Sequence, residues 1–319
     1  MDIVRPTEIG GFVGQKAAID NLSVFTSAAL SRGEPVDHVL FHGPPGLGKT
    51  TLAGIVAHQM GANLRHASAP AIEKISDIVA LVMALDEGDV LFMDEIHRLP
   101  MPVEEVLYSA LEDRKIDIMV GEGMEQRAMS MELPRFTFVG ATTRIGAISR
   151  PMLDRFGITV RLEFYSPEDL AEIVRRQAVS AGVAIEQDAS LEIGRRARGT
   201  PRIAGRLLRR VVDFAAVAGE VTVLRSRVAE ALKRMDVDAI GLDWSDSRYL
   251  EVLATHYRGG PAGVETMAVA LSEPKDTLED VIEPFLIRQG LVARTGRGRI
   301  LTDAGWRHLG LRPPEKEAA

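Results

Sequence analysis

Residues 43–50, GPPGLGKT, constrain the fold more than any other part of the chain. They match the pattern G-x-x-x-x-G-K-[ST], with the apolar run VLF before them and the helical pattern TTLAGIVAHQM after them. This order predicts a phosphate-binding loop between a strand and a helix. The glycines let backbone N–H groups face phosphate oxygens, and the start of the helix presents its positive end to the anion. A glycine-rich turn that contains a lysine by chance is the weaker alternative.

The loop predicts ATP and Mg²⁺ as cofactors. We expect Gly46 and Gly48 to shape the backbone cradle and Lys49 to reach the β- and γ-phosphates. Thr50 follows directly and offers a hydroxyl to Mg²⁺.

A second apolar run, VLFM at residues 90–93, leads into Asp94 and Glu95. We expect Asp94 to hold Mg²⁺, partly through water, and Glu95 to orient and deprotonate the attacking water. An acidic pair that only caps a helix is the alternative. A third run, FTFVGAT, ends at Thr142 and Thr143, where a hydroxyl could contact the γ-phosphate. Ordinary strand-end threonines fit that stretch equally well.

Length and composition bound the remaining possibilities. The 319 residues suffice for several domains, and the net charge of −7 still allows a local basic face that binds nucleic acid. The chain has no cysteine, which excludes disulfides, thiolate metal sites and cysteine nucleophiles. No apolar run reaches the length of a membrane span, and the first residues do not resemble a signal peptide. We therefore expect a cytoplasmic protein without a membrane anchor.

The order of patterns predicts an α/β architecture followed by helices. Three buried strands separated by helices indicate a parallel sheet. Ser166 is a plausible N-cap with Pro167 at the first helical position, and the pattern stays helical to about residue 240. A third segment ends in a hairpin-like pattern and a polar tail. The expected domains are 1–165, 166–240 and 241–312, with a loose tail at 313–319.

The motifs, taken in order, resemble those of the AAA+ ATPases and, among them, the RuvB family of motors that drive branch migration of Holliday junctions. The resemblance covers nearly the whole chain, and its specific parts are LFMDEIHRL, GATTRIG, EPFLIRQGLVARTGRGR and RHLG. It implies an AAA+ P-loop domain with a parallel sheet, a small helical lid and a C-terminal winged helix. It also implies a homohexamer on double-stranded DNA that works with RuvA, the junction-binding protein, and with a RuvC-type resolvase.

The resemblance also implies nucleotide contacts beyond the loop. Val4 and Arg5 would lie against the adenine, and Tyr165 beside the base at the hinge. Arg202 would act as a second sensor of the γ-phosphate. The remaining implied contacts with phosphate, Mg²⁺ or nucleotide are Gly46, Lys49, Thr50, Thr51, Glu112, Asp113 and Arg114.

Arg155 lies in RPMLDRFG, beyond the third strand. ATP hydrolysis by this class often needs one more cation at the γ-phosphate, supplied from outside the pocket. We interpret Arg155 as an arginine finger that acts on the neighbouring subunit. A structural salt bridge with Asp154 or another acid is the alternative. Many family members have a further arginine two positions earlier, where this chain has Leu153.

The third segment predicts a DNA-binding wing. TLEDVIEPFLIRQG reads as a helix, and LVARTGRGRIL reads as two strands around a glycine-rich basic turn. Such a turn suits phosphate contacts that are independent of base sequence. Arg294 and Arg299 match the DNA-contacting residues of the family, with Lys275 a weaker third. A solvated turn is the alternative.

Residues 116–134 alternate loosely around two glycines and predict a hairpin rich in methionine. In the family this hairpin docks RuvA, whereas a hairpin packed on its own domain is the alternative. The favoured function is an ATP-driven DNA motor for recombination and repair. A clamp-loader-like AAA+ ATPase and an ATP-switched DNA-binding regulator remain the alternatives.

Overall fold

A computed structural model describes residues 6–120 and 127–313 of the chain. The chain divides after Tyr165 into two compact units. None of the helices within the described ranges is long and apolar enough to cross a membrane.

The first unit is built on a five-stranded sheet in the order β2-β3-β6-β1-β7, and every pair in it is parallel. The strands are β1 (Val39–His42), β2 (Leu64–Ser68), β3 (Val90–Asp94), β6 (Thr137–Thr142) and β7 (Ile158–Arg161). The three strands expected from apolar runs, β1, β3 and β6, occupy the buried centre, which confirms the α/β fold. The sequence did not reveal β2 and β7, because these edge strands carry exposed residues in place of apolar runs.

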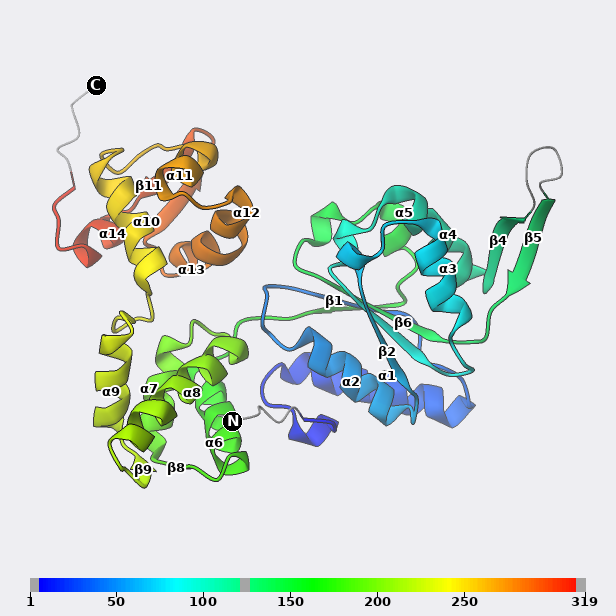
Figure 1. Ribbon diagram of the computed structural model, residues 1–319, viewed down its shortest axis with the longest axis horizontal. Coiled ribbons are helices and arrows are strands. Elements are labelled where there is room, and N and C mark those ends of the chain that lie inside the picture. Colours follow the sequence, from blue (N-terminus) through cyan, green and yellow to red (C-terminus); the bar gives the residue numbers. More distant parts are fainter. Residues whose placement is uncertain (1–5, 121–126, 314–319) are drawn as a thin grey trace. The chain divides into compact units, whose positions relative to one another are not determined.

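Helices cover both faces of this sheet (Figure 1). On one side lie α1 (Lys16–Arg32) and α2 (Lys49–Gln59), and on the other α3 (Ile75–Met83) and α4 (Met101–Glu112). The core packs Leu91 and Phe138 of the sheet against Ile78 and Leu107 of α3 and α4. Full burial of one such side chain contributes about 1.5–3 kcal/mol. The short elements of this unit are η1 (Ile9–Gly11), η2 (Ala69–Ala71), η3 (Ile96–Arg98), η5 (Ile145–Ala147) and α5 (Arg150–Leu153).

The expected hairpin is present as β4 (Lys115–Val120) and β5 (Arg127–Glu132), which pair antiparallel from Lys115↔Glu132 onward. It extends from the body of the first unit (Figure 1). Its tip, residues 121–126 with Met124, lies outside the described residues.

The second unit begins with four helices, α6 (Pro167–Ser180), α7 (Gln187–Arg196), α8 (Pro201–Val217) and α9 (Arg225–Arg234). Ser166 caps α6 as expected, since its hydroxyl accepts a 3.0 Å hydrogen bond from the backbone N–H of Asp169. The expectation of helix alone is wrong at two places. Strands β8 (Ala184–Ile185) and β9 (Thr222–Val223) pair in parallel, and each is too short to show a periodicity of 2.

The rest of this unit is a winged helix, with a core around Tyr249, Leu253, Leu286 and Trp306. Its elements are α10 (Trp244–Thr255), α11 (Val264–Leu271), α12 (Lys275–Thr277), η6 (Leu278–Ile282), α13 (Glu283–Arg288), β10 (Val292–Thr295), β11 (Gly298–Leu301) and α14 (Asp303–His308). The helix expected near residues 277–290 is present, but it passes through a π-helical turn at η6 before α13. Pro284 is the second residue of α13, and its missing N–H gives a reason for the irregular turn just before it.

A buried charge cluster joins the helical lid to the winged helix inside the second unit. Arg198, in the turn between α7 and α8, donates to the Gly241 carbonyl at 2.9 Å and pairs with Asp243 at 2.7 Å and with Asp246. Burial raises the pKa of the Asp246 carboxyl to about 7, and the Arg198 guanidinium opposes that shift. Breaking a buried pair of this kind costs several kcal/mol, so the cluster ties the two parts firmly.

Candidate nucleotide-binding and DNA-binding sites

The phosphate loop connects the end of β1 to the start of α2. Gly43, Gly46 and Gly48 have φ values of 139°, 78° and 103°, a region that only glycine adopts without strain. A Cβ at Gly43 would lie 2.5 Å from the carbonyl oxygen of Leu162, so the backbone also requires glycine for space. The loop ends where α2 begins, which directs free N–H groups and the positive helix end toward an anion.

Lys49 is the first residue of α2 and is buried. Its ammonium donates to the carbonyl oxygens of Gly43 at 2.8 Å and Pro44 at 2.9 Å, which holds it against the loop backbone. His42 precedes the loop, and its pKa is lowered by burial and by the charges of Arg161 and Lys49. The imidazole of His42 is therefore neutral at neutral pH. Lys49 is the residue that brings positive charge to the loop.

Two aromatic side chains, Tyr165 and Phe12, lie against the loop. The Tyr165 hydroxyl donates to the Leu47 carbonyl at 3.0 Å, and a Cβ at Gly48 would lie 3.3 Å from the Phe12 ring. Tyr165 was expected beside the nucleotide, and its contact with the loop fits that position. The sequence did not reveal Phe12, because its segment has neither a periodicity nor a chemical motif. Val4 and Arg5, expected at the adenine, lie outside the described residues.

Asp94 is the last residue of β3. It lies at the carboxyl-end edge of the sheet, where the strands end and the phosphate loop begins. The parallel register places His42 of β1 beside Thr142 of β6, and Met93 of β3 beside Gly140. The carboxyl ends of these strands therefore meet, as ligand sites of open α/β sheets do.

Glu95 follows Asp94 with a left-handed backbone, φ 55°. Its N–H donates to Asp94 Oδ1 at 3.0 Å, and its carboxylate pairs with the Arg98 guanidinium at 3.3 Å. The side chain of Glu95 is 42% exposed, so water can reach the carboxylate. Sequence reasoning missed Arg98 as a partner of Glu95, although its i,i+3 spacing was a usable signal.

The two threonines after β6 differ in their surroundings. The buried Thr142 hydroxyl lies 3.0 Å from His97 Nδ1 and accepts the Arg144 N–H at 3.0 Å, so it braces the strand end. His97 thus packs against the strand end. Thr143 is partly exposed. Its role at the γ-phosphate stays a prediction.

The donors at this edge fit a magnesium nucleotide. Thr50, the second residue of α2, offers a hydroxyl, and Asp94 offers a carboxylate. Mg²⁺ keeps several waters and binds through one or two protein oxygens together with substrate phosphates. Thr51 is partly exposed in the same first turn of α2.

Arg155 lies at the amino-end edge of the sheet, where the strands begin, opposite to the phosphate loop. It comes three residues before Ile158, which begins β7 and pairs with Val39, the first residue of β1. The phosphate loop follows the last residue of β1 instead. The length of a four-residue strand, roughly 13 Å, separates the two edges. Arg155 and the phosphate loop of the same chain therefore face in opposite directions along the strands.

The Arg155 side chain is held by its own domain. It forms an ion pair with Glu112, and its guanidinium carbon lies 5.7 Å from the centre of the Tyr108 ring. Asp154 pairs instead with Arg150 at 3.9 Å. A salt bridge of the kind considered as the alternative is present, with Glu112 as the acid. The Arg155 side chain remains 27% exposed, so it also stays accessible to a partner.

Glu112 and Arg114 were expected at the nucleotide. They lie beside Arg155, at the amino ends of the strands. A hollow of about 630 Å³ is lined there by charged residues of both signs, namely Glu34, Asp37, Glu112, Arg114, Arg135, Asp154 and Arg155. Asp113 lies between Glu112 and Arg114 as the C-cap of α4. The structure thus divides the expected nucleotide residues of this unit into one group at the loop and another around Arg155. Arg202 is exposed in the first turn of α8 and belongs to the second unit.

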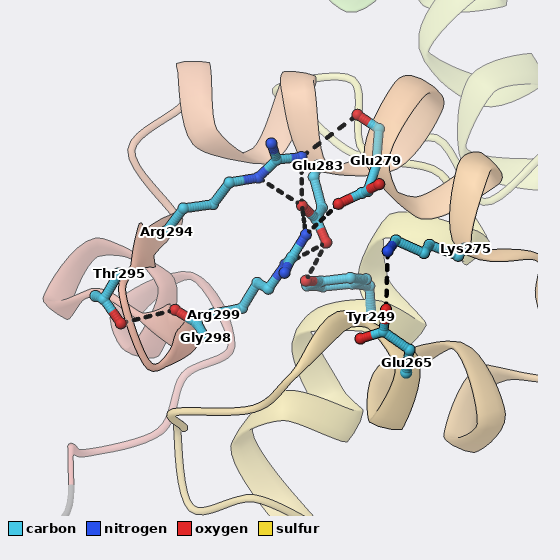
Figure 2. A network of polar contacts seen from close by, with 9 residues as sticks. All are labelled: Tyr249, Glu265, Lys275, Glu279, Glu283, Arg294, Thr295, Gly298 and Arg299. Atoms are coloured by element: carbon cyan, nitrogen blue, oxygen red, sulfur yellow. Dashed lines mark hydrogen bonds and ion pairs between the residues drawn. The ribbon is translucent and has the colours of Figure 1, made fainter.

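The wing arginines enter a network of ion pairs in the second unit (Figure 2). Arg294 and Arg299 both bond to Glu283, whose side chain is fully buried, and 46% and 12% of their own side chains are exposed. Lys275 pairs with Glu265 at 2.8 Å on the surface. Sequence reasoning missed Glu283, because it is one of several acids in a helical pattern and nothing in the sequence marks it as buried.

A parallel sheet with a phosphate loop, an acidic strand end, a helical lid and a winged helix defines a P-loop ATPase of the AAA+ class. Three family models match consecutive parts of the chain. They are the Holliday junction DNA helicase RuvB P-loop domain at residues 4–162, the RuvB AAA lid domain at 165–238 and the RuvB C-terminal winged helix domain at 239–310. The chain belongs to the RuvB family.

Individual relatives agree with this assignment. The Holliday junction branch migration complex subunit RuvB of Gluconobacter oxydans is 54% identical over 314 residues, which cover 98% of this chain and 90% of that protein. The subunit of the same name from Granulibacter bethesdensis is 54% identical over 315 residues, 99% of this chain and 88% of that protein. The solved structure of the Thermotoga maritima RuvB Holliday junction branch migration motor superposes with a TM-score of 0.90 at 42% identity, covering 98% of this chain and 100% of that one.

Proposed function

We propose that this chain is the ATP-hydrolysing subunit of a homohexameric motor that pumps duplex DNA and drives branch migration of Holliday junctions. One observation carries the proposal. The same chain has a phosphate loop beside an acidic strand end and a winged helix with a basic wing. A clamp-loader-like ATPase shares the first feature and does not require the second. A DNA-binding regulator that barely turns over ATP does not require Glu95 or Arg155.

The chemistry follows from the geometry at the loop edge. Backbone N–H groups and Lys49 would hold the phosphates, and Thr50 and Asp94 would provide oxygen ligands for Mg²⁺. The bound ion would neutralise charge on the β- and γ-phosphates. Glu95, whose carboxylate pairs with Arg98 in this structure, would accept a proton from the attacking water.

Arg155 completes the pocket of the next subunit in this proposal. Arg155 lies at the amino ends of the strands, whereas the phosphate loop of its own chain lies at their carboxyl ends. This separation favours action in trans. Glu112 and Arg114 share that edge, so we assign them to the same interface. Arg202 would sense the γ-phosphate from the lid.

The decisive test is migration of a synthetic four-way junction by the purified protein with ATP, with and without a RuvA-type protein. We expect migration that requires ATP and is strongly stimulated by the partner, together with ATP turnover that rises with linear duplex DNA. Brisk turnover without any junction movement would favour the clamp-loader-like reading. Duplex binding with negligible turnover would favour the regulator. Cooperation with a RuvC-type resolvase would be tested as faster junction cleavage.

The wing predicts binding that does not depend on base sequence. Arg294→Ala combined with Arg299→Ala should weaken binding to unrelated duplexes and flatten its dependence on salt by about one to two units of slope, since each lost phosphate contact lowers counterion release. Basal ATP turnover without DNA should barely change. Normal duplex binding at near-physiological salt would show that the wing is not the DNA contact.

The β4–β5 hairpin is our candidate for docking the RuvA-type partner. Ile116 near its base is buried in the core, whereas Met129 on β5 is 54% exposed. Met129→Asp should place a charge in an apolar contact and weaken partner binding at least tenfold, while folding and basal ATP turnover persist. Titration of the partner checks this, with Ser130→Asp on the opposite face of the strand as the control. Equal affinities for both variants would exclude this face.

A further inference from the structure

We infer that Glu283 is a positioning residue for DNA binding: its buried carboxylate fixes Arg294 and Arg299 in the geometry that meets the phosphate backbone. The inference rests on the proposed DNA contact of the wing and adds an acidic residue on which that contact depends.

Glu283 lies at the centre of the network in Figure 2. Arg294 donates to Oε2 through Nε at 2.8 Å, and its Nη2 forms an ion pair with the same oxygen at 2.6 Å. Arg299 donates through Nε to Oε1 at 2.9 Å and through Nη2 to Oε2 at 3.1 Å. The Tyr249 hydroxyl donates to Oε1 at 3.0 Å. Two strands of the wing and helix α10 are thereby bonded to one side chain at the start of α13.

A carboxylate in this position needs a specific reason. Glu283 and Tyr249 are fully buried, and burying a charge is costly unless it is paired and hydrogen-bonded. Arg299 meets that requirement with two N–H donors, one for each oxygen of the carboxylate, and Arg294 and Tyr249 add one hydrogen bond each. The network is therefore rigid, and breaking it at Glu283 would leave Arg299 with Glu279 alone and Arg294 with a single 3.5 Å hydrogen bond to the Glu279 carbonyl.

The charges of the network cancel. Arg294 and Arg299 contribute two positive charges, and Glu279 and Glu283 contribute two negative charges, because Arg299 also pairs with Glu279 at 2.9 Å. Arg294 and Arg299 are thus not surplus charge that attracts DNA from a distance. Their contribution has to come from orientation, since a side chain that is already immobilised loses less freedom on binding. Arg294, with 46% of its side chain exposed, is the member presented to solvent.

Two opposite effects of removing the acid can be separated. If Glu283 positions the arginines, its loss weakens DNA binding. If it only neutralises them, its loss strengthens binding through the additional positive charge. Glu265 provides a matched control, because it is an exposed acid of the same domain paired with Lys275, and Glu265→Gln removes the same charge.

The test compares Glu283→Gln, Glu265→Gln and the unaltered full-length chain in binding to a random-sequence duplex over a series of salt concentrations. We expect Glu283→Gln to weaken binding by about tenfold, within the range for releasing two ordered side chains, and to lower the salt slope by about one. Glu265→Gln should leave affinity unchanged or raise it slightly. A merely structural role would lower the melting temperature of Glu283→Gln without changing the salt slope.

Unchanged or tighter binding by a folded Glu283→Gln would overturn the inference. If that variant does not fold, Tyr249→Phe removes only one hydrogen bond to the carboxylate, and a two- to threefold loss of affinity is expected from the looser network. Tyr249→Phe with unaltered affinity and slope would then overturn it. Failure of the unaltered chain to bind duplex at all, or indifference to the Arg294→Ala, Arg299→Ala double change, would instead contradict the proposed function.

Discussion

Arg155→Ala should leave ATP binding intact and lower ATP turnover by roughly 10³-fold or more, the usual scale for a finger. The phosphate loop, Asp94 and Glu95 lie at the other sheet edge and lose none of their contacts. The measurement is steady-state turnover alongside nucleotide affinity. Arg150→Ala is the matched control, because Arg150 is an exposed arginine in the preceding helix and pairs only at 3.9 Å with Asp154.

Mixing two inactive variants decides between action in trans and the salt bridge with Glu112. Arg155→Ala keeps an intact pocket, and Glu95→Gln keeps an intact finger. An interface between them in one order combines both intact parts, so mixed assemblies should recover part of the ATP turnover. Proven mixed assemblies without any recovery would assign Arg155 to holding its own domain together through Glu112.

Glu95→Gln should keep nucleotide affinity while lowering hydrolysis by about 10²–10⁴-fold, since the phosphate and Mg²⁺ ligands remain and only the proton acceptor is lost. Single-turnover hydrolysis and a separate binding titration measure the two effects. Arg98→Ala serves as the control, because it removes the partner of Glu95 and leaves the carboxylate in place. Equal losses of affinity and turnover in Glu95→Gln would sink the assignment. Lys49→Ala, by contrast, should weaken both.

The sequence predicted the parts of this protein that a single local pattern determines. The loop, the central strands β1, β3 and β6, and the wing strands were predictable from apolar runs and glycine spacing. Edge strands β2 and β7 were not, since one face of an edge strand meets solvent and its apolar run is interrupted.

Spatial relations across the chain were less accessible. The resemblance named Glu112, Arg114 and Arg155 without showing that one sheet edge brings them together. That grouping depends on strand order, which no local pattern encodes. Thr142 and Thr143 were indistinguishable in sequence, and the structure distinguishes them by the burial of Thr142 and its contacts with His97 and Arg144. Glu283 was missed because its partners lie eleven and sixteen residues further along the chain.

The opposite placement of the phosphate loop and Arg155 has a consequence for assembly. A contact between the Arg155 side of one subunit and the phosphate-loop side of the next is a head-to-tail contact. Such contacts either close into rings or continue as open rows. An open row always has one fewer complete pocket than it has subunits, because its last loop meets no arginine. Closure alone gives every pocket its arginine, so a closed ring such as the proposed one has no idle site. Assembly would then govern catalysis as directly as nucleotide supply does.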